Sequence, residues 1–215
     1  MQQVIEKALS NLLQNFEITY AGRTDAGVHA KHQVLSVVTD EKISESFKTS
    51  FNALVGKHIY IKQIKIAKES FHPRYDAIER TYKYFVNTPS NFEPYNLGYS
   101  YLINEELDIS NLNFYAESFL GVNNFTNFSK LRKDQEPTRE ITVSKWTRNS
   151  QFFIYTISGN SFLHNMVRSL VGIQLACQSG KINKASIDSA LKKPQKARFN
   201  YVAPPEGLYL WKIKY

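Results

Sequence analysis

The chain has 215 residues, 42% of them hydrophobic, which is enough to bury a substantial core as one domain or as two small ones. Its 27 lysines and arginines against 19 aspartates and glutamates give a net charge of +8, which favours a polyanionic partner. No segment approaches the roughly 18 consecutive apolar residues of a membrane span, and the first residues lack a signal-peptide pattern. We therefore expect a cytoplasmic protein that does not enter a membrane.

The first third of the chain alternates helical and strand-like segments. Apolar residues recur at helical spacing over residues 2–14, and strand-like residues follow at 17–20 and 34–38. Ser44 can cap a second helix. Isoleucines then alternate over 58–66, which predicts a strand with a bulge or a bend.

The rest of the chain also mixes both kinds of element. Residues 77–87 alternate aromatic and charged side chains, as in a strand with a face that could hold a base, and the loop that follows marks a junction. The further predicted elements are a helix capped by Ser110, a β-hairpin over 141–146 and 151–157, helices over 158–179 and 186–191, and a strand over 208–213. We therefore predict an α+β fold in two mixed halves, 1–87 and 88–215.

The stretch between the strands predicted at 17–20 and 34–38 has the composition of a functional site. It holds an acid, Asp25, and a base, Arg23, between Gly22 and Gly27, which allow a tight turn or a close approach to a ligand. The planar guanidinium of Arg23 suits a phosphate or the face of a base. Asp25 could instead be an ordinary turn residue, since aspartate favours turns.

The segment 158–179 carries a single charged residue, Arg168, among many apolar ones. Burying an unpaired guanidinium costs several kcal/mol, so Arg168 should find a carboxylate or a charged ligand. We predict that it pairs with Asp25.

Lys130, Arg132, Lys133 and Arg139 lie in a polar loop that Pro137 interrupts. A solvated loop is the ordinary interpretation of such a run. In a chain of charge +8, beside an aromatic strand, contact with phosphates is the better one.

No motif indicates metal or cofactor chemistry. His29 and His32 are three residues apart, but they lack the cysteine or carboxylate cluster of a typical zinc site. The chain also has no phosphate-binding loop, nucleophile elbow or dinucleotide fingerprint. We expect neither a metal nor a cofactor.

Five blocks of sequence resemble the tRNA pseudouridine synthase A family, in the family's order. They span nearly the whole chain, and the first and fourth are specific to the family. The blocks are Gly22–Ala30, Phe71–Tyr84, Gly121–Phe128, Gly159–Arg168 and Glu206–Leu210.

This resemblance implies the pseudouridine synthase fold, with the sheets of two halves lined up around a central basic cleft. It implies isomerisation of uridine to pseudouridine in the anticodon stem-loop of tRNA, at positions 38 to 40, by a homodimer without a cofactor. Asp25 matches the catalytic aspartate, acting as nucleophile or base. Tyr82 matches the tyrosine that stacks on the uracil, Arg168 the arginine that pairs with the aspartate, and Arg23 the arginine that helps displace the target base.

Two other classes of function remain. A catalytically inactive RNA-binding protein on the same fold is the main alternative, but Asp25, Tyr82 and Arg168 together are what an enzyme needs. A DNA-binding protein is disfavoured, because no helix-turn-helix pattern is present.

The resemblance also raises an expectation about the first half. In the family, a strand and a loop resembling Tyr-Asp-Gly-Thr precede the helix that corresponds to residues 2–14. We expect its absence here to leave backbone groups of the first-half sheet unpaired, at roughly 1 to 3 kcal/mol for each buried group.

Overall fold

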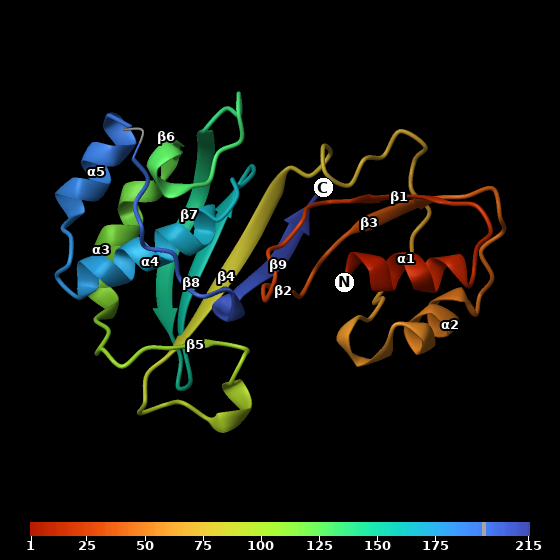
Figure 1. Cartoon of the computed structure of the whole chain (residues 1–215), viewed down its shortest axis with the longest axis horizontal. Coiled ribbons are helices and arrows are strands. Elements are labelled where there is room, and N and C mark those ends of the chain that lie inside the picture. The colour runs from red at the N-terminus through yellow and green to blue at the C-terminus, as the bar shows by residue number, and fades with distance from the viewer. Residues whose placement is uncertain (195–196) are drawn as a thin grey trace. The chain divides into compact units, whose positions relative to one another are not determined.

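The computed structural model of the chain describes residues 1–194 and 197–215 (Figure 1). It divides into two compact units, of which the first comprises Met1–Ala21 and Val34–Asp76 and the second comprises Gly22–Gln33 and Ala77–Tyr215. These units do not coincide with the predicted halves 1–87 and 88–215, because the loop around Asp25 and the strand after Ala77 both belong to the second unit. All the candidate site residues therefore lie in one unit.

Unit 1 packs two helices and a two-stranded sheet. The helices and strands are α1 (Gln2–Ser10), β1 (Glu17–Tyr20), β3 (Leu35–Val38) and α2 (Phe47–Leu54), followed by the 3-10 turn η1 (Gly56–His58). Strands β1 and β3 are antiparallel, with Glu17 opposite Val38 and Tyr20 opposite Leu35. A buried cluster that includes Leu9, Leu13 and Phe51 joins the helices, so the helical spacing at the start of the chain predicts its core correctly.

Two predictions for unit 1 are wrong in detail. The residue before α2 is Ser46, which makes no side-chain capping bond. Ser44 accepts the Phe47 N–H through its carbonyl, while its hydroxyl bonds the Ser46 hydroxyl at 3.1 Å and caps no helical N–H. The strand predicted over 58–66 does not form. The side chain of Asn52 takes both backbone groups of Ile61, at 2.7 Å and 3.2 Å, as a neighbouring strand would.

Unit 2 is built on a mixed seven-stranded sheet. Its path is β2-β9-β4-β8-β7-β6, with β5 beside β4; β2–β9 and β4–β5 are parallel and the other pairs are antiparallel. The strands are β2 (His29–Ala30), β4 (Glu79–Asn87), β5 (Tyr101–Leu102), β6 (Gly121–Asn124), β7 (Thr138–Arg148), β8 (Phe153–Gly159) and β9 (Leu208–Lys214). The predicted aromatic strand, hairpin and final strand are thus confirmed.

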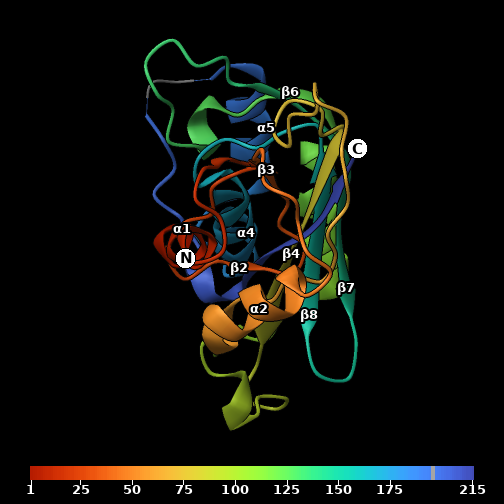
Figure 2. The same cartoon turned by 90° about the vertical axis from the view of Figure 1, so that its right-hand side faces the viewer.

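Three helices of unit 2 lie on one face of this sheet. They are α3 (Ile109–Ala116), α4 (Met166–Gln178) and α5 (Lys184–Lys192), and Figure 2 shows α4 and α5 on the same side of β4, β8 and β7. Tyr84 and Tyr155 from the sheet are fully buried with Leu170 and Ile173 of α4. The short turns between these elements are η2 (Pro94–Asn96), η3 (Glu117–Phe119), η4 (Thr126–Phe128) and η5 (Pro205–Gly207). The α+β class is confirmed, while the central cleft between two sheets stays a prediction.

Two helix boundaries in unit 2 differ from their predictions. Helix α4 begins at Met166 and not near Ser158, because Ser158 still belongs to β8 and Asn165 has a left-handed backbone with φ of 61°. Helix α3 is capped by Asp108, whose carboxylate accepts the N–H groups of Ser110 and Asn111, so Ser110 is inside the helix.

Among the described residues, no helix is long and apolar enough to cross a membrane.

The segment before β9 approaches α4 and β4 so closely that only glycine fits at two positions. A Cβ atom on Gly172 would lie 2.8 Å from the Tyr201 carbonyl oxygen, and one on Gly207 would lie 2.7 Å from the Tyr84 ring. These approaches allow Ala203 N–H to donate to the Arg168 carbonyl at 3.0 Å. The segment that reaches the Arg168 side chain is thereby fixed against α4.

We predict that Gly172→Ala destabilises the protein by about 1 to 3 kcal/mol through this steric overlap. The sign of the change in unfolding free energy is diagnostic, because replacing glycine by alanine inside a helix otherwise stabilises a protein by about 1 kcal/mol. Gly22→Ala is the control, since a Cβ atom there meets nothing within 4 Å. Urea unfolding of both variants measures the effect, and a stabilising Gly172→Ala would contradict the close approach.

Candidate active site

The loop that carries Asp25 is a tight turn. Val28 N–H donates to the Asp25 carbonyl at 3.1 Å, and Gly27 has φ of +80°, as the third position of a type II turn requires. A Cβ atom on Gly27 would lie 2.9 Å from Cγ of Pro205. Gly27 is therefore needed both for the turn and for contact with the segment before β9.

The Asp25 carboxylate is held by one cation and one imidazole. Its Oδ2 lies 3.2 Å from Nη1 of Arg168, and its Oδ1 lies 3.3 Å from Nε2 of His164. The side chain of Asp25 is 30% exposed and that of Arg168 only 17%. The predicted pairing of Arg168 with Asp25 is confirmed.

The N–H donors of the Arg168 guanidinium find acceptors in three segments of the chain. Besides Asp25, Nε donates to the Ala203 carbonyl at 2.8 Å and Nη1 donates to Oδ1 of Asn165 at 3.4 Å. A cation with so little water around it needs such partners. The permanent charge of arginine keeps a cation beside the carboxylate at every physiological pH.

Tyr82, on β4, is partly buried within range of the Asp25 charge. Burial raises the pKa of Tyr82 to about 12; the Arg80 charge lowers it in part, and the Asp25 charge raises it further. The ring packs edge-on against Phe162, with the centroids 5.1 Å apart. Tyr82 therefore presents a neutral phenol near the carboxylate.

Arg23 differs from the other predicted site residues in its exposure. It lies two residues before Asp25 in the same loop, and its side chain is on the surface of the unit. The structure thus brings together Asp25, Arg168 and Tyr82, and leaves Arg23 facing solvent beside them.

His164 is a site residue that the sequence analysis did not single out. It stands four residues before Arg168, inside the family-like block Gly159–Arg168, and this spacing is the signal that could have identified it. Its contact with Asp25 joins residues 139 positions apart, which periodicity along the chain cannot reveal.

One residue of the basic loop predicted to contact phosphates makes hydrogen bonds within the loop instead. Nη1 of Arg139 donates to the Glu136 carbonyl at 2.9 Å, and burial lowers the Arg139 pKa below that of an ordinary arginine. Lys130, Arg132 and Lys133 are exposed. Contact of these three residues with phosphates stays a prediction, whereas Arg139 holds the loop in shape.

The two histidines considered for zinc have other contacts. His29 stacks between Tyr99 and Tyr209, with ring centroids 5.2 Å and 4.6 Å away, and Nδ1 of His32 accepts the Ile213 N–H at 3.0 Å. Within residues 1–194 and 197–215, no group of three or more histidine, cysteine, aspartate or glutamate residues could hold a metal ion.

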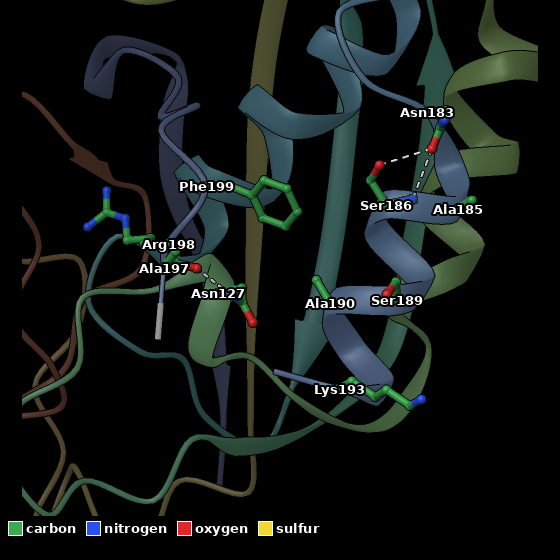
Figure 3. Close-up of a pocket in the computed structure, with 10 residues that line it drawn as sticks. All are labelled: Asn127, Asn183, Ala185, Ser186, Ser189, Ala190, Lys193, Ala197, Arg198 and Phe199. Carbon is green, nitrogen blue, oxygen red and sulfur yellow. Dashed lines mark hydrogen bonds between the residues drawn. The ribbon is translucent and has the colours of Figure 1, made fainter. Parts of the chain in front are cut away.

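A pocket of about 540 Å³ lies away from Asp25, between α5 and residues 197–199 (Figure 3). The described residues that line it are Asn127, Asn183, Ala185, Ser186, Ser189, Ala190, Lys193, Ala197, Arg198 and Phe199. They include no carboxylate and no histidine, and Asn183 is engaged as the cap of α5. Arg198 points away from Phe199 and α5 in Figure 3. Acid–base chemistry is therefore better placed at Asp25.

A carboxylate beside a fixed arginine, partly open to solvent and next to a neutral aromatic ring, can act as a nucleophile or as a base. The ring offers a surface for stacking a planar ligand. This set of groups suits chemistry on a nucleotide, which is also what the net charge of +8 favours.

Comparison with known proteins agrees with this geometry. A family model described as tRNA pseudouridine synthase matches residues 115–215. The tRNA pseudouridine synthase A of Bacillus subtilis (strain 168) is 33% identical over 220 residues, which cover all of this chain and 89% of that protein. Proteins of the same name from Borrelia duttonii (strain Ly) and Borreliella afzelii (strain PKo) are 34% identical, again over 89% of their length. The chain belongs to the tRNA pseudouridine synthase A family.

Proposed function

We propose that the protein isomerises uridine to pseudouridine in tRNA, with Asp25 as its catalytic residue. The observation that carries this proposal is the Asp25–Arg168 ion pair beside Tyr82, in a chain whose relatives are named for the reaction. In the net reaction, the bond between N1 of uracil and C1′ of ribose breaks and a bond between C5 and C1′ forms. One proton leaves C5 and one is gained at N1, so the isomerisation consumes no cofactor or co-substrate.

Asp25 starts this sequence either as a nucleophile or as a base that removes a proton from the sugar. Both roles need an ionised carboxylate, and the Arg168 guanidinium lies 3.2 Å from it as the counter-charge. Because Arg168 also donates to Ala203 and Asn165, the cation is held in place before substrate arrives. Such preorganised charges need little rearrangement during the reaction.

Tyr82 and Arg23 serve the uracil in this proposal. The neutral ring of Tyr82 stacks on the base once it has left the stem, and the exposed Arg23 helps to displace it. We place the target uridines in the anticodon stem-loop, at positions 38 to 40.

The partners and location follow from the substrate. The exposed Lys130, Arg132 and Lys133 contact phosphates of the tRNA, the enzyme acts in the cytoplasm, and it works as a homodimer. Sedimentation of the protein with and without tRNA measures the oligomeric state.

We predict that Asp25→Asn lowers the rate of pseudouridine formation at least about a thousandfold while leaving tRNA affinity within a few fold, because the amide keeps the shape but is neither base nor nucleophile. Tritium release from labelled unmodified tRNA and filter binding measure the two quantities. Asp40→Asn, at an exposed position of unit 1, is the control. An inactive wild type that binds tRNA would favour the alternative of an RNA-binding protein without catalysis.

We predict that Tyr82→Phe retains most activity from pH 6 to 9, because the Tyr82 hydroxyl is already neutral there, while Tyr82→Leu loses activity together with the stacking surface.

The partly buried phenol of Tyr82 also predicts how the free energy of unfolding of the wild type and of Tyr82→Phe should differ with pH. A phenol with a pKa of about 12 when folded and about 10 when unfolded stabilises the fold fully below pH 10. That advantage disappears as the pH rises from 10 to 12. The wild type should therefore lose unfolding free energy relative to Tyr82→Phe only above pH 10.

We predict that tRNA binding weakens steeply with salt and that changing Lys130, Arg132 and Lys133 together to Gln lowers the logarithmic slope by about 2, at 0.7 to 0.9 for each lost phosphate contact. Changing Lys181, Lys192 and Lys193 to Gln removes the same charge elsewhere on unit 2 and should affect the slope less. Equal effects of the two triple variants would contradict contact at the 130–133 loop.

A further inference from the structure

We propose that His164 is a positioning residue for Asp25. Nε2 of its imidazole lies 3.3 Å from Oδ1 of Asp25, and this contact sets the rotation of the carboxylate. The inference rests on the proposed function, in which that carboxylate is catalytic, and it adds a residue to which no role has been assigned.

Arg168 alone cannot orient Asp25. An arginine that binds a carboxylate through two nitrogens fixes its plane, but here only Nη1 reaches Asp25, because Nε donates to Ala203. A carboxylate held at one oxygen can turn about its Cβ–Cγ bond, since this torsion has broad energy wells. The contact of His164 with the second oxygen removes that freedom.

His164 also stands on a fixed backbone. Its carbonyl accepts the Lys130 N–H at 2.9 Å, and the carbonyl of the buried residue Leu163 accepts the Met166 N–H at 3.1 Å. Asn165, in the left-handed conformation, turns the chain into α4 and places its own side chain on Arg168. His164, Asn165 and Arg168 thus bring their side chains to the same ion pair, from the first turn of α4 and the two residues before it.

Solvent exposure increases across the site from Arg168 to His164. The His164 side chain is 47% exposed, Asp25 is 30% exposed and Arg168 is 17% exposed. A substrate must approach the carboxylate from the open side, where His164 lies. His164 therefore holds the oxygen that the substrate meets first, while Arg168 holds the inner one.

The test uses glutamine as a donor that does not titrate. Its amide nitrogen stands as many bonds from Cβ as Nε2 of histidine does. With the full-length protein and saturating unmodified tRNA, we expect His164→Ala to lower the single-turnover rate about 10- to 100-fold at unchanged affinity, as loss of orientation does. We expect His164→Gln to recover most of that rate. His58→Gln, an exposed histidine of unit 1, should behave as wild type.

Two outcomes would overturn the inference: His164→Ala as fast as wild type, or His164→Gln as slow as His164→Ala. Proton NMR of the free protein separates this inference from the function. The His164 ring signal, assigned by its absence in His164→Gln, should shift in Asp25→Asn. A shifted signal in a protein that makes no pseudouridine would refute the function and leave the contact standing, whereas an unshifted signal would refute the contact.

Discussion

The partly buried guanidinium of Arg168 is the constraint on which the site depends. Its side chain is only 17% exposed, so its hydrogen bonds must come from the protein. They come from Asp25 in the loop, from Asn165 before α4 and from Ala203 before β9. One cation therefore joins the Asp25 loop, the start of α4 and the segment before β9, and removing Asp25 would leave its charge without compensation.

Close backbone packing brings those acceptors within reach. Gly27, Gly172 and Gly207 each face the segment 201–207 or belong to it, and a Cβ atom at any of them would overlap a neighbour at 2.7 to 2.9 Å. Tyr84 adds a hydrogen bond of 2.7 Å from its buried hydroxyl to the Pro204 carbonyl. The block Glu206–Leu210 thus has a structural role. Glycine at position 207 lets this segment lie against the ring of Tyr84, and β9 continues from the segment.

Much of the fold could be predicted from the sequence where local pattern and packing agree. The helical spacing of α1, the alternation of β4 and the hairpin β7–β8 are examples, and the lone charge in an apolar segment predicted the partner of Arg168. The strand at 58–66 could not be excluded, because the amide of Asn52 competes for the backbone of Ile61 only in three dimensions. The start of α4 depends on the left-handed Asn165, and the role of His164 on a contact across the fold, neither of which periodicity records.

The separation of the paired residues along the chain bears on how the protein folds during synthesis. Asp25 and Arg168 are 143 residues apart, and β2 pairs with β9, where His29 lies opposite Tyr209 near the C-terminus. Contacts of such long sequence separation form late, because loop closure must precede them. The loop with the carboxylate leaves the ribosome early and has no partner for its charge until almost the whole chain has emerged. A nascent or truncated chain therefore carries the residues of the site without the site itself.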